Sequence, residues 1–298
     1  MTALPTRHLR DADGPAVGPF AWWAALLGLT LLATFDAWSH MVALGLYDDE
    51  ASHAMLVPLI GAWLFLLRIG RLEQIKLRPS LAGAAIVLLG AIVYCQGYRT
   101  FNLELRDLGA VIVAIGCTMA ALGMRFFRAF AVAILIFLFM VPLPGSWRLG
   151  LTAPLQTLAA AATQTILGWM GLGSERFGNL LTINGVQVTV AEACAGMRMT
   201  WSLVLVSYAF AFTTPLRPTV RGLVILCSPV LAIVCNVVRL VPTVWVYGNF
   251  STETADTFHD LSGWGMLFLG YVLLVGSVWL LDLIGVPVMA KRKKEAAA

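Results

Sequence analysis

The sequence predicts an all-α polytopic membrane protein with about eight transmembrane helices. Of its 298 residues, 59% are apolar and only 12% are charged, and the mean hydropathy is +0.84. Apolar runs of about 18 or more residues, long enough to cross roughly 30 Å of hydrocarbon, recur along nearly the whole chain. The basic residues stand in short loops between these runs, where they orient a membrane protein. The net charge of +4 therefore does not indicate a nucleic-acid partner.

The apolar runs define a single membrane domain over residues 20–286 of the chain. A cytoplasmic tail of residues 1–19 precedes it, and a basic cytoplasmic tail of residues 287–298 follows it. No small-residue cleavage site stands out after the first run, so we expect that run to be retained as a helix. The eight predicted spans are 20–40, 54–70, 81–98, 108–124, 127–143, 196–213, 219–245 and 260–286.

The distribution of charge predicts the direction of these spans. Fourteen of the 20 Lys and Arg residues fall in the segments predicted to be inside, including the Lys291-Arg292-Lys293-Lys294 tail, and six fall outside. This bias follows the positive-inside rule. It predicts an inner-membrane protein with both termini in the cytoplasm.

A long outer segment, residues 144–195, is predicted to hold an amphipathic helix and then a β-hairpin. The helix covers Ser146–Leu172 and would lie in the interface or pack in the bundle. Asn184-Gly185 separates two alternating runs, which is a strong signal for a type I′ hairpin that leads directly to Cys194. The predicted apolar face of the helix comprises Leu151, Leu155, Leu158, Ile166, Leu167 and Met170, opposite Thr152, Gln156, Thr163 and Gln164.

Three reactive side chains, Cys194, Arg239 and His259, stand at the predicted outer ends of the last three spans. A thiol, a fixed cation and an imidazole are the parts of a nucleophile, an oxyanion partner and a general acid or base. Such side chains are costly at membrane depth, and spans joined by short connections are neighbours. Each residue alone also has a plain structural interpretation: a small packing residue, a cation snorkelling to the headgroups, or an interfacial histidine.

Four supporting residues surround this predicted catalytic group. The beginning of a helix favours a thiolate at Cys194, and Gly196 and Arg198 follow it, the latter adding positive charge on the same face. Glu192 opposes the thiolate if it is ionised nearby, or instead holds Arg198 or a loop amide. Asn236 would orient the Arg239 guanidinium or donate to a substrate carbonyl. Asp260 is a weak candidate to orient His259, because adjacent residues do not face one another in a helix.

No cofactor or metal is expected. The five cysteines form no CxxC pair and match no zinc spacing. His40 and His53 flank an acidic stretch, Asp48-Asp49-Glu50; a metal site is conceivable there, but a solvated acidic loop is the better interpretation because the spacing matches no defined site.

The stretch Glu192-Ala193-Cys194-Ala195-Gly196-Met197-Arg198 resembles a motif of the exosortase/archaeosortase family. Asn236-Val237-Val238-Arg239 and the later His259 also fit that family, as do Ser52–Leu59 and Val141–Pro144 upstream. Ala195 departs from the pattern, because many relatives have Ser or Asn there. The similarity runs from about residue 48 to residue 285.

The resemblance implies catalytic roles for Cys194, Arg239 and His259 in an integral-membrane cysteine protease or transpeptidase. It implies secreted protein substrates whose C-terminal sorting signal has a short, often Pro-Glu-Pro-like motif, a transmembrane helix and a basic tail. Cleavage would occur at the periplasmic membrane surface through a thioacyl intermediate, with water or an amine on a membrane lipid or glycan as acceptor.

The sequence is also compatible with two other functions. A thiol-redox protein would pair Cys95 with Cys194, although such enzymes usually need a second cysteine pair. A transporter would carry polar residues near the membrane midplane, whereas here the polar residues gather at the outer rim.

Overall fold

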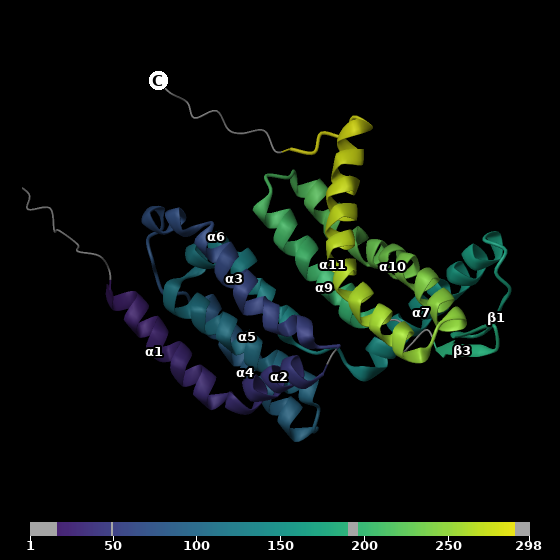
Figure 1. Ribbon diagram of the computed structural model, residues 1–298. Coiled ribbons are helices and arrows are strands. Elements are labelled where there is room, and N and C mark those ends of the chain that lie inside the picture. Colours follow the sequence, from purple (N-terminus) through teal and green to yellow (C-terminus); the bar gives the residue numbers. More distant parts are fainter. Residues whose placement is uncertain (1–16, 49, 190–195, 290–298) are drawn as a thin grey trace, which may run out of the picture. The chain divides into compact units, whose positions relative to one another are not determined.

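The computed structural model describes residues 17–48, 50–189 and 196–289, and these residues are mostly helical (Figure 1). Among them, four helices are long and apolar enough to cross a membrane: α4 (Leu81–Arg99), α5 (Leu103–Leu122), α10 (Pro218–Asn249) and α11 (Thr252–Leu283). The number rises to six if each of two sharply bent helix pairs forms one span. These helices support a multi-pass membrane protein, but the predicted count of eight spans is not confirmed.

The first predicted span, 20–40, is broken. Helix α1 (Val17–Ala33) and helix α2 (Phe35–Tyr47) meet at Thr34 with a bend of 76°. The Thr34 hydroxyl donates to the carbonyl of Thr30 at 2.8 Å and accepts from the Trp38 indole at 3.0 Å. Such side-chain bonds to the helix backbone accompany bends.

Two further predicted spans are shorter or bent. The span predicted at 54–70 is the 3₁₀ turn η1 (Ser52–Leu56) followed by α3 (Val57–Leu66), with a second turn, η2 (Ile69–Gln74), after it. The span predicted at 127–143 is α6 (Met124–Leu135) continued by η3 (Ile136–Met140), and the chain then bends by 94° into α7 (Gly145–Trp169). Pro142 and Pro144 stand at this bend, where they cannot continue a helix.

The chain divides into two compact units, one of Met1–Trp38 with Gly70–Ala131 and the other of Ser39–Ile69 with Val132–Ala298. In the first unit, α4 and α5 pack with their backbones in close approach. Glycines recur every seven residues on α4, and a Cβ added at any of them would collide with the backbone of α5. Small residues of this kind let membrane helices approach closely. The glycines of the two helices that form this seam are Gly83, Gly90, Gly97, Gly109 and Gly116.

In the second unit, α9 (Gly196–Thr213), α10 and α11 pack on one another. Gly270 of α11 lies where the other two helices meet: a Cβ there would be 2.9 Å from Leu203 of α9 and 3.7 Å from the Cys235 sulfur of α10. The bounds predicted for the sixth span, 196–213, are those of α9. The helices predicted at 219–245 and 260–286 are present as α10 and α11, but α11 begins at Thr252, so that His259 lies within the helix and not before it.

A small antiparallel sheet packs beside α7 and α10 in the same unit (Figure 1). Its strands are β1 (Ser174–Phe177), β2 (Leu180–Ile183) and β3 (Val186–Thr189). The predicted hairpin is confirmed: Ile183 pairs with Val186, and the turn residues Asn184 and Gly185 have positive φ angles of 50° and 79°. Strand β1, which the sequence analysis did not predict, pairs with β2 and extends the hairpin.

Helix α7 confirms the helix predicted over Ser146–Leu172, but its packed face differs from the prediction. Ala159, Ala160, Thr163 and Leu167 are buried, whereas Leu158 is 55% exposed and Met170 60% exposed. Thr163 is buried although the pattern of the sequence sets it opposite the apolar face. Small side chains allow closer packing than leucine does, and leucine loses nothing by facing lipid.

Candidate functional site

Arg239 is buried within α10, in a helix that is otherwise apolar over most of its length. Only 3% of its surface is exposed. The α11 residue against it is Gly263, where an added Cβ would lie 3.6 Å from Nη1 of Arg239. The absence of a side chain at Gly263 therefore leaves room for the guanidinium between α10 and α11. An arginine buried at membrane depth is a functional candidate, because its desolvation is costly.

His259 lies on α11 one turn before Gly263, and therefore on the same face of that helix. Its side chain is 21% exposed. The shared face brings the imidazole toward the same seam as the Arg239 guanidinium. Two of the three predicted catalytic residues thus stand on the facing sides of one pair of helices.

His259 contacts Asp260, a neighbour that helix geometry makes a weak candidate to orient the ring. Its Nδ1 lies 3.3 Å from Oδ1 of Asp260, although neighbouring helix residues do not normally face one another. Asp260 is 84% exposed, so its side chain bends around the helix surface to reach the ring. Water competes for so exposed a carboxylate, and the contact adds little stability.

A second contact between α10 and α11 lies beyond Arg239, where the two helices approach their connecting turn. The Tyr247 hydroxyl donates to Oδ1 of Asp256 at 2.6 Å. Asp256 stands one turn before His259 on the face that meets α10. This hydrogen bond, the Arg239–Gly263 contact and the Cys235–Gly270 contact follow one another along the seam, and they set the antiparallel register of the two helices.

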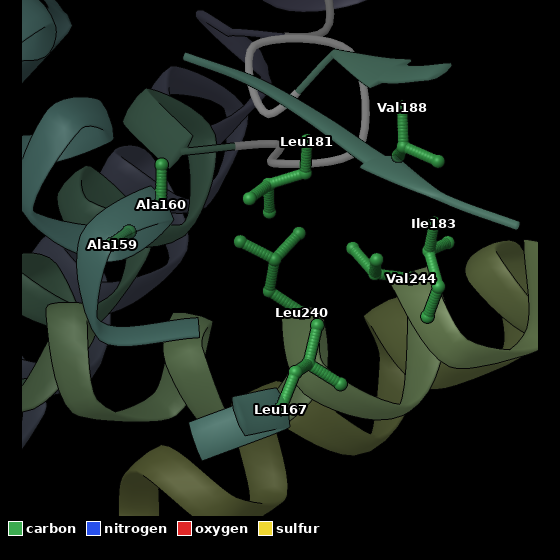
Figure 2. Close-up of a cluster of buried hydrophobic side chains, with 8 residues drawn as sticks. All are labelled: Ala159, Ala160, Leu167, Leu181, Ile183, Val188, Leu240 and Val244. Carbon is green, nitrogen blue, oxygen red and sulfur yellow. The ribbon is translucent and has the colours of Figure 1, made fainter. Parts of the chain in front are cut away.

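The sheet is anchored to α10 directly beside Arg239. Figure 2 shows Leu181, Ile183 and Val188 of the sheet gathered with Leu240 and Val244 of α10, and the small face of α7 completes this buried cluster. Leu240 is the next residue after Arg239. A shared apolar core therefore holds the hairpin at the part of α10 that carries the candidate cation.

The end of the hairpin is fixed to α10 by a close contact and by hydrogen bonds. A Cβ at Gly248 would lie 2.6 Å from Cγ2 of Ile183. The Asn184 side-chain amide donates to the Gly248 carbonyl at 3.1 Å and approaches the Asn249 side chain at 3.4 Å. Only glycine at position 248 lets the hairpin lie this close.

Cys194 and Glu192 lie outside the described residues. The segment that carries them joins β3, which ends at Thr189, to α9, which begins at Gly196. Both of these elements pack on α10. The six residues 190–195 thus connect two elements that flank the Arg239 helix.

The remaining supporting residues belong to elements that the structure describes. Gly196 and Arg198 stand in the first turn of α9. Asn236 is half-buried on α10, three residues before Arg239 and on the same helical face. Gly263, Tyr247 and Asp256 were not predicted; the only sequence signal for Gly263 was its spacing of seven residues from Gly270.

His53 is a packed residue rather than part of a solvated loop. Its ring stacks on Trp201 of α9, with centroids 6.0 Å apart, and its Nδ1 lies 3.1 Å from the Glu50 carbonyl. Nearby, Arg148 of α7 pairs with Glu50 at 2.8 Å. These contacts fix the chain before α3 against the second turn of α9.

The described residues contain no group of three or more His, Cys, Asp or Glu side chains placed to hold a metal ion. The described residues offer a buried guanidinium on α10 and a partly exposed imidazole on α11, the helix that packs against it. These are groups for acyl transfer.

A family model described as transmembrane exosortase matches residues 38–276. No curated protein and no solved structure matches the chain. The matched region includes α9, α10, most of α11 and the hairpin, and it covers well over half of the sequence. The chain therefore belongs to the transmembrane exosortase family.

Proposed function

We propose that this protein is a membrane-embedded cysteine protease or transpeptidase that removes the C-terminal sorting signal of secreted proteins. Membership of the exosortase family supports a transpeptidase or protease of the membrane. The contacts between α10 and α11 support a catalytic site that includes Arg239 and His259. There the buried Arg239 guanidinium faces Gly263, and His259 stands one turn away on the same helix face.

The first chemical step is the attack of the Cys194 thiolate on a peptide carbonyl carbon of the substrate, just outside the bilayer. The carbonyl oxygen becomes an oxyanion, which the Arg239 guanidinium stabilises by donating hydrogen bonds. The carbon–nitrogen bond then breaks, and the departing amine takes a proton from the His259 imidazolium. The products are a thioester on Cys194 and the released membrane anchor.

The second step returns the enzyme to its starting state. Water, or an amine of a surface lipid or glycan, attacks the thioester carbon while His259 accepts its proton. The carbon–sulfur bond breaks, and the Cys194 thiolate and the His259 imidazolium are restored. The reaction needs no oxidant, metal or cofactor to balance.

Arg239 suits the oxyanion role because its charge is fixed and its donors form a rigid plane. Its position between two helices limits its rotamers, so the donors are oriented before the substrate arrives. Loss of a single oxyanion donor typically costs about 10²–10³ in rate.

The test is a mass-spectrometric measurement of the new C-terminus of a host protein that ends in a motif, an apolar helix and a basic tail. Wild-type protein should yield a shortened product, whereas Cys194→Ala should leave the full-length substrate in the membrane. Cys227→Ala is the matched control, since this half-buried cysteine lies elsewhere on α10, and it should process substrate normally.

Normal processing by Cys194→Ala at wild-type protein levels would refute the nucleophile assignment. A redox function makes a different prediction, because it requires Cys95 as the partner of Cys194. Loss of processing in Cys95→Ser would favour redox chemistry, whereas normal processing by this variant would argue against it.

A further inference from the structure

A cavity of about 650 Å³ lies in the first unit, where the end of α1 meets the end of α4. Its volume is within the range of small-molecule sites. It belongs to neither the α10–α11 seam nor the hairpin, and the proposed reaction does not use it. The lining residues are Ala33, Asp36, Tyr94, Cys95, Tyr98 and Arg99.

One side of this cavity suits a cation. The Asp36 carboxylate accepts a hydrogen bond from the Tyr98 hydroxyl at 3.3 Å. The rings of Tyr94 and Tyr98 stand beside it, with centroids 6.1 Å apart and planes inclined by 42°. A carboxylate next to aromatic faces is the arrangement that binds organic ammonium groups.

The lining of the cavity also includes a group that suits an anion. Arg99, at the C-terminal end of α4, also lines the cavity, and its guanidinium forms no ion pair with any residue in 17–48, 50–189 or 196–289. Asp36 and Arg99 thus line the same cavity, and no ion pair joins their side chains. Guanidinium groups bind phosphate well, because their planar donors match its oxygens.

The apolar surface around the cavity favours an amphiphilic ligand over a fully water-soluble one. Large apolar side chains are exposed on the two helices that form it, including Leu32 at 73% and Ile92 at 59%. Phe35 and Phe101 are exposed at the same end, at 62% and 92%. Aromatic residues gathered at the end of apolar helices are typical of the membrane–water interface.

We propose that this cavity binds the headgroup of a zwitterionic phospholipid. The ammonium group lies against Asp36 and the two tyrosine rings, the phosphate lies against Arg99, and the acyl chains follow the apolar sides of α1 and α4. The charge bias of the sequence places these helix ends at the outer leaflet. The lipid is a structural ligand of the first unit, and its binding does not depend on the proposed catalytic activity.

Full-length protein in nanodiscs tests the proposal. The lipid would be phosphatidylglycerol, which lacks the ammonium group, with increasing proportions of phosphatidylethanolamine. Because the exposed Cys95 lines the cavity, bound headgroup should slow its alkylation by a membrane-impermeant maleimide, measured on the Cys95 peptide by mass spectrometry. Native mass spectrometry should also detect retained phosphatidylethanolamine after mild extraction.

Asp36→Asn should weaken the retention of phosphatidylethanolamine about tenfold, as loss of one charge-assisted hydrogen bond does. Asp36→Glu keeps the charge and should retain binding. The matched control is Glu104→Gln, which removes one negative charge from the first turn of α5 and lies outside the cavity; it should bind like wild type. Both substituted acids are accessible to solvent, so the helices should still pack, and a monodisperse elution profile checks this.

Three results would overturn the proposal. One is equal protection of Cys95 by phosphatidylglycerol alone. Another is unchanged lipid retention in Asp36→Asn. The third is equal protection by soluble O-phosphoethanolamine, which would make the ligand a free zwitterion rather than a membrane lipid.

Discussion

Arg239 and His259 illustrate how single residues acquire a candidate role from their surroundings. Arg239 is 3% exposed in a helix that is long and apolar enough to cross a membrane, so it is far too buried to be explained as a side chain snorkelling to the headgroups. Its guanidinium is accommodated because residue 263 has no side chain. The partly exposed His259 stands one turn away. The two residues thus stand on helices that pack together, with the cation buried and the imidazole partly exposed.

Substitutions at Gly263 should separate packing from catalysis. The Cβ of Gly263→Ala would lie 3.6 Å from Nη1 of Arg239, which is an ordinary contact, so we expect near-normal processing. Gly263→Leu extends into the space of the guanidinium and should reduce processing about 10²-fold or more, because the oxyanion donors are displaced. The measurement is the fraction of substrate with a new C-terminus at equal enzyme levels. If Gly263→Leu is as active as Gly263→Ala, Arg239 does not act from this seam.

Among the elements, the hairpin depends most on its attachment to neighbouring helices. Leu181, Ile183 and Val188 bury their side chains against α7 and α10, and Asn184 bonds to the end of α10. The segment with Cys194 leaves from β3 and reaches α9, so the position of the sheet limits where the thiol can be presented. A hairpin by itself would be only marginally stable in water. Its packing on two helices supplies the rigidity.

A double-mutant cycle tests this attachment. Gly248→Ala should destabilise the protein by about 1–3 kcal/mol, because its new Cβ would meet Cγ2 of Ile183 at 2.6 Å. Ile183→Ala alone should cost about 2–4 kcal/mol through the cavity that it leaves. The double variant should be more stable than the sum of the two predicts, by about 0.5–3 kcal/mol, since the truncated side chain removes the collision. Thermal unfolding in detergent measures each variant, and additive effects would contradict a close contact.

At the scale of the whole molecule, the charge bias and the described helices agree on a multi-pass membrane protein. The direction of insertion remains a prediction from the positive-inside rule. It places η2, with Glu73, on the cytoplasmic side and strand β1, with Glu175, on the outer side. Both glutamates are exposed, and so both positions can report on the side they face.

Labelling of introduced cysteines checks this orientation. In spheroplasts with an intact membrane, an impermeant maleimide should modify Glu175→Cys and leave Glu73→Cys unmodified until the membrane is permeabilised. Peptide-level mass spectrometry separates these sites from the native cysteines. The reverse pattern would place the α10–α11 turn and the hairpin in the cytoplasm, where a secreted substrate would not reach them.

The sequence by itself determined that the chain is mostly helical, because long apolar runs have few alternatives to a helix in a bilayer. It also determined the hairpin, since Asn184-Gly185 favours the positive φ angles of a type I′ turn. Of the candidate residues, Arg239 and His259 stand on α10 and α11, which pack together. Cys194 lies outside the described residues, and its catalytic role remains a prediction.

Only the tertiary structure decided which faces of those helices pack and where the helices break. Lipid and protein interior are equally apolar, so hydropathy does not distinguish a buried face from a lipid-facing one. For this reason Thr163 is buried while Leu158 is exposed. The contacts of Gly263 with Arg239 and of Asp256 with Tyr247 likewise depend on how α10 and α11 pack. The break at Thr34 depends on side-chain hydrogen bonds within an apolar run, which a pattern based on hydropathy does not detect.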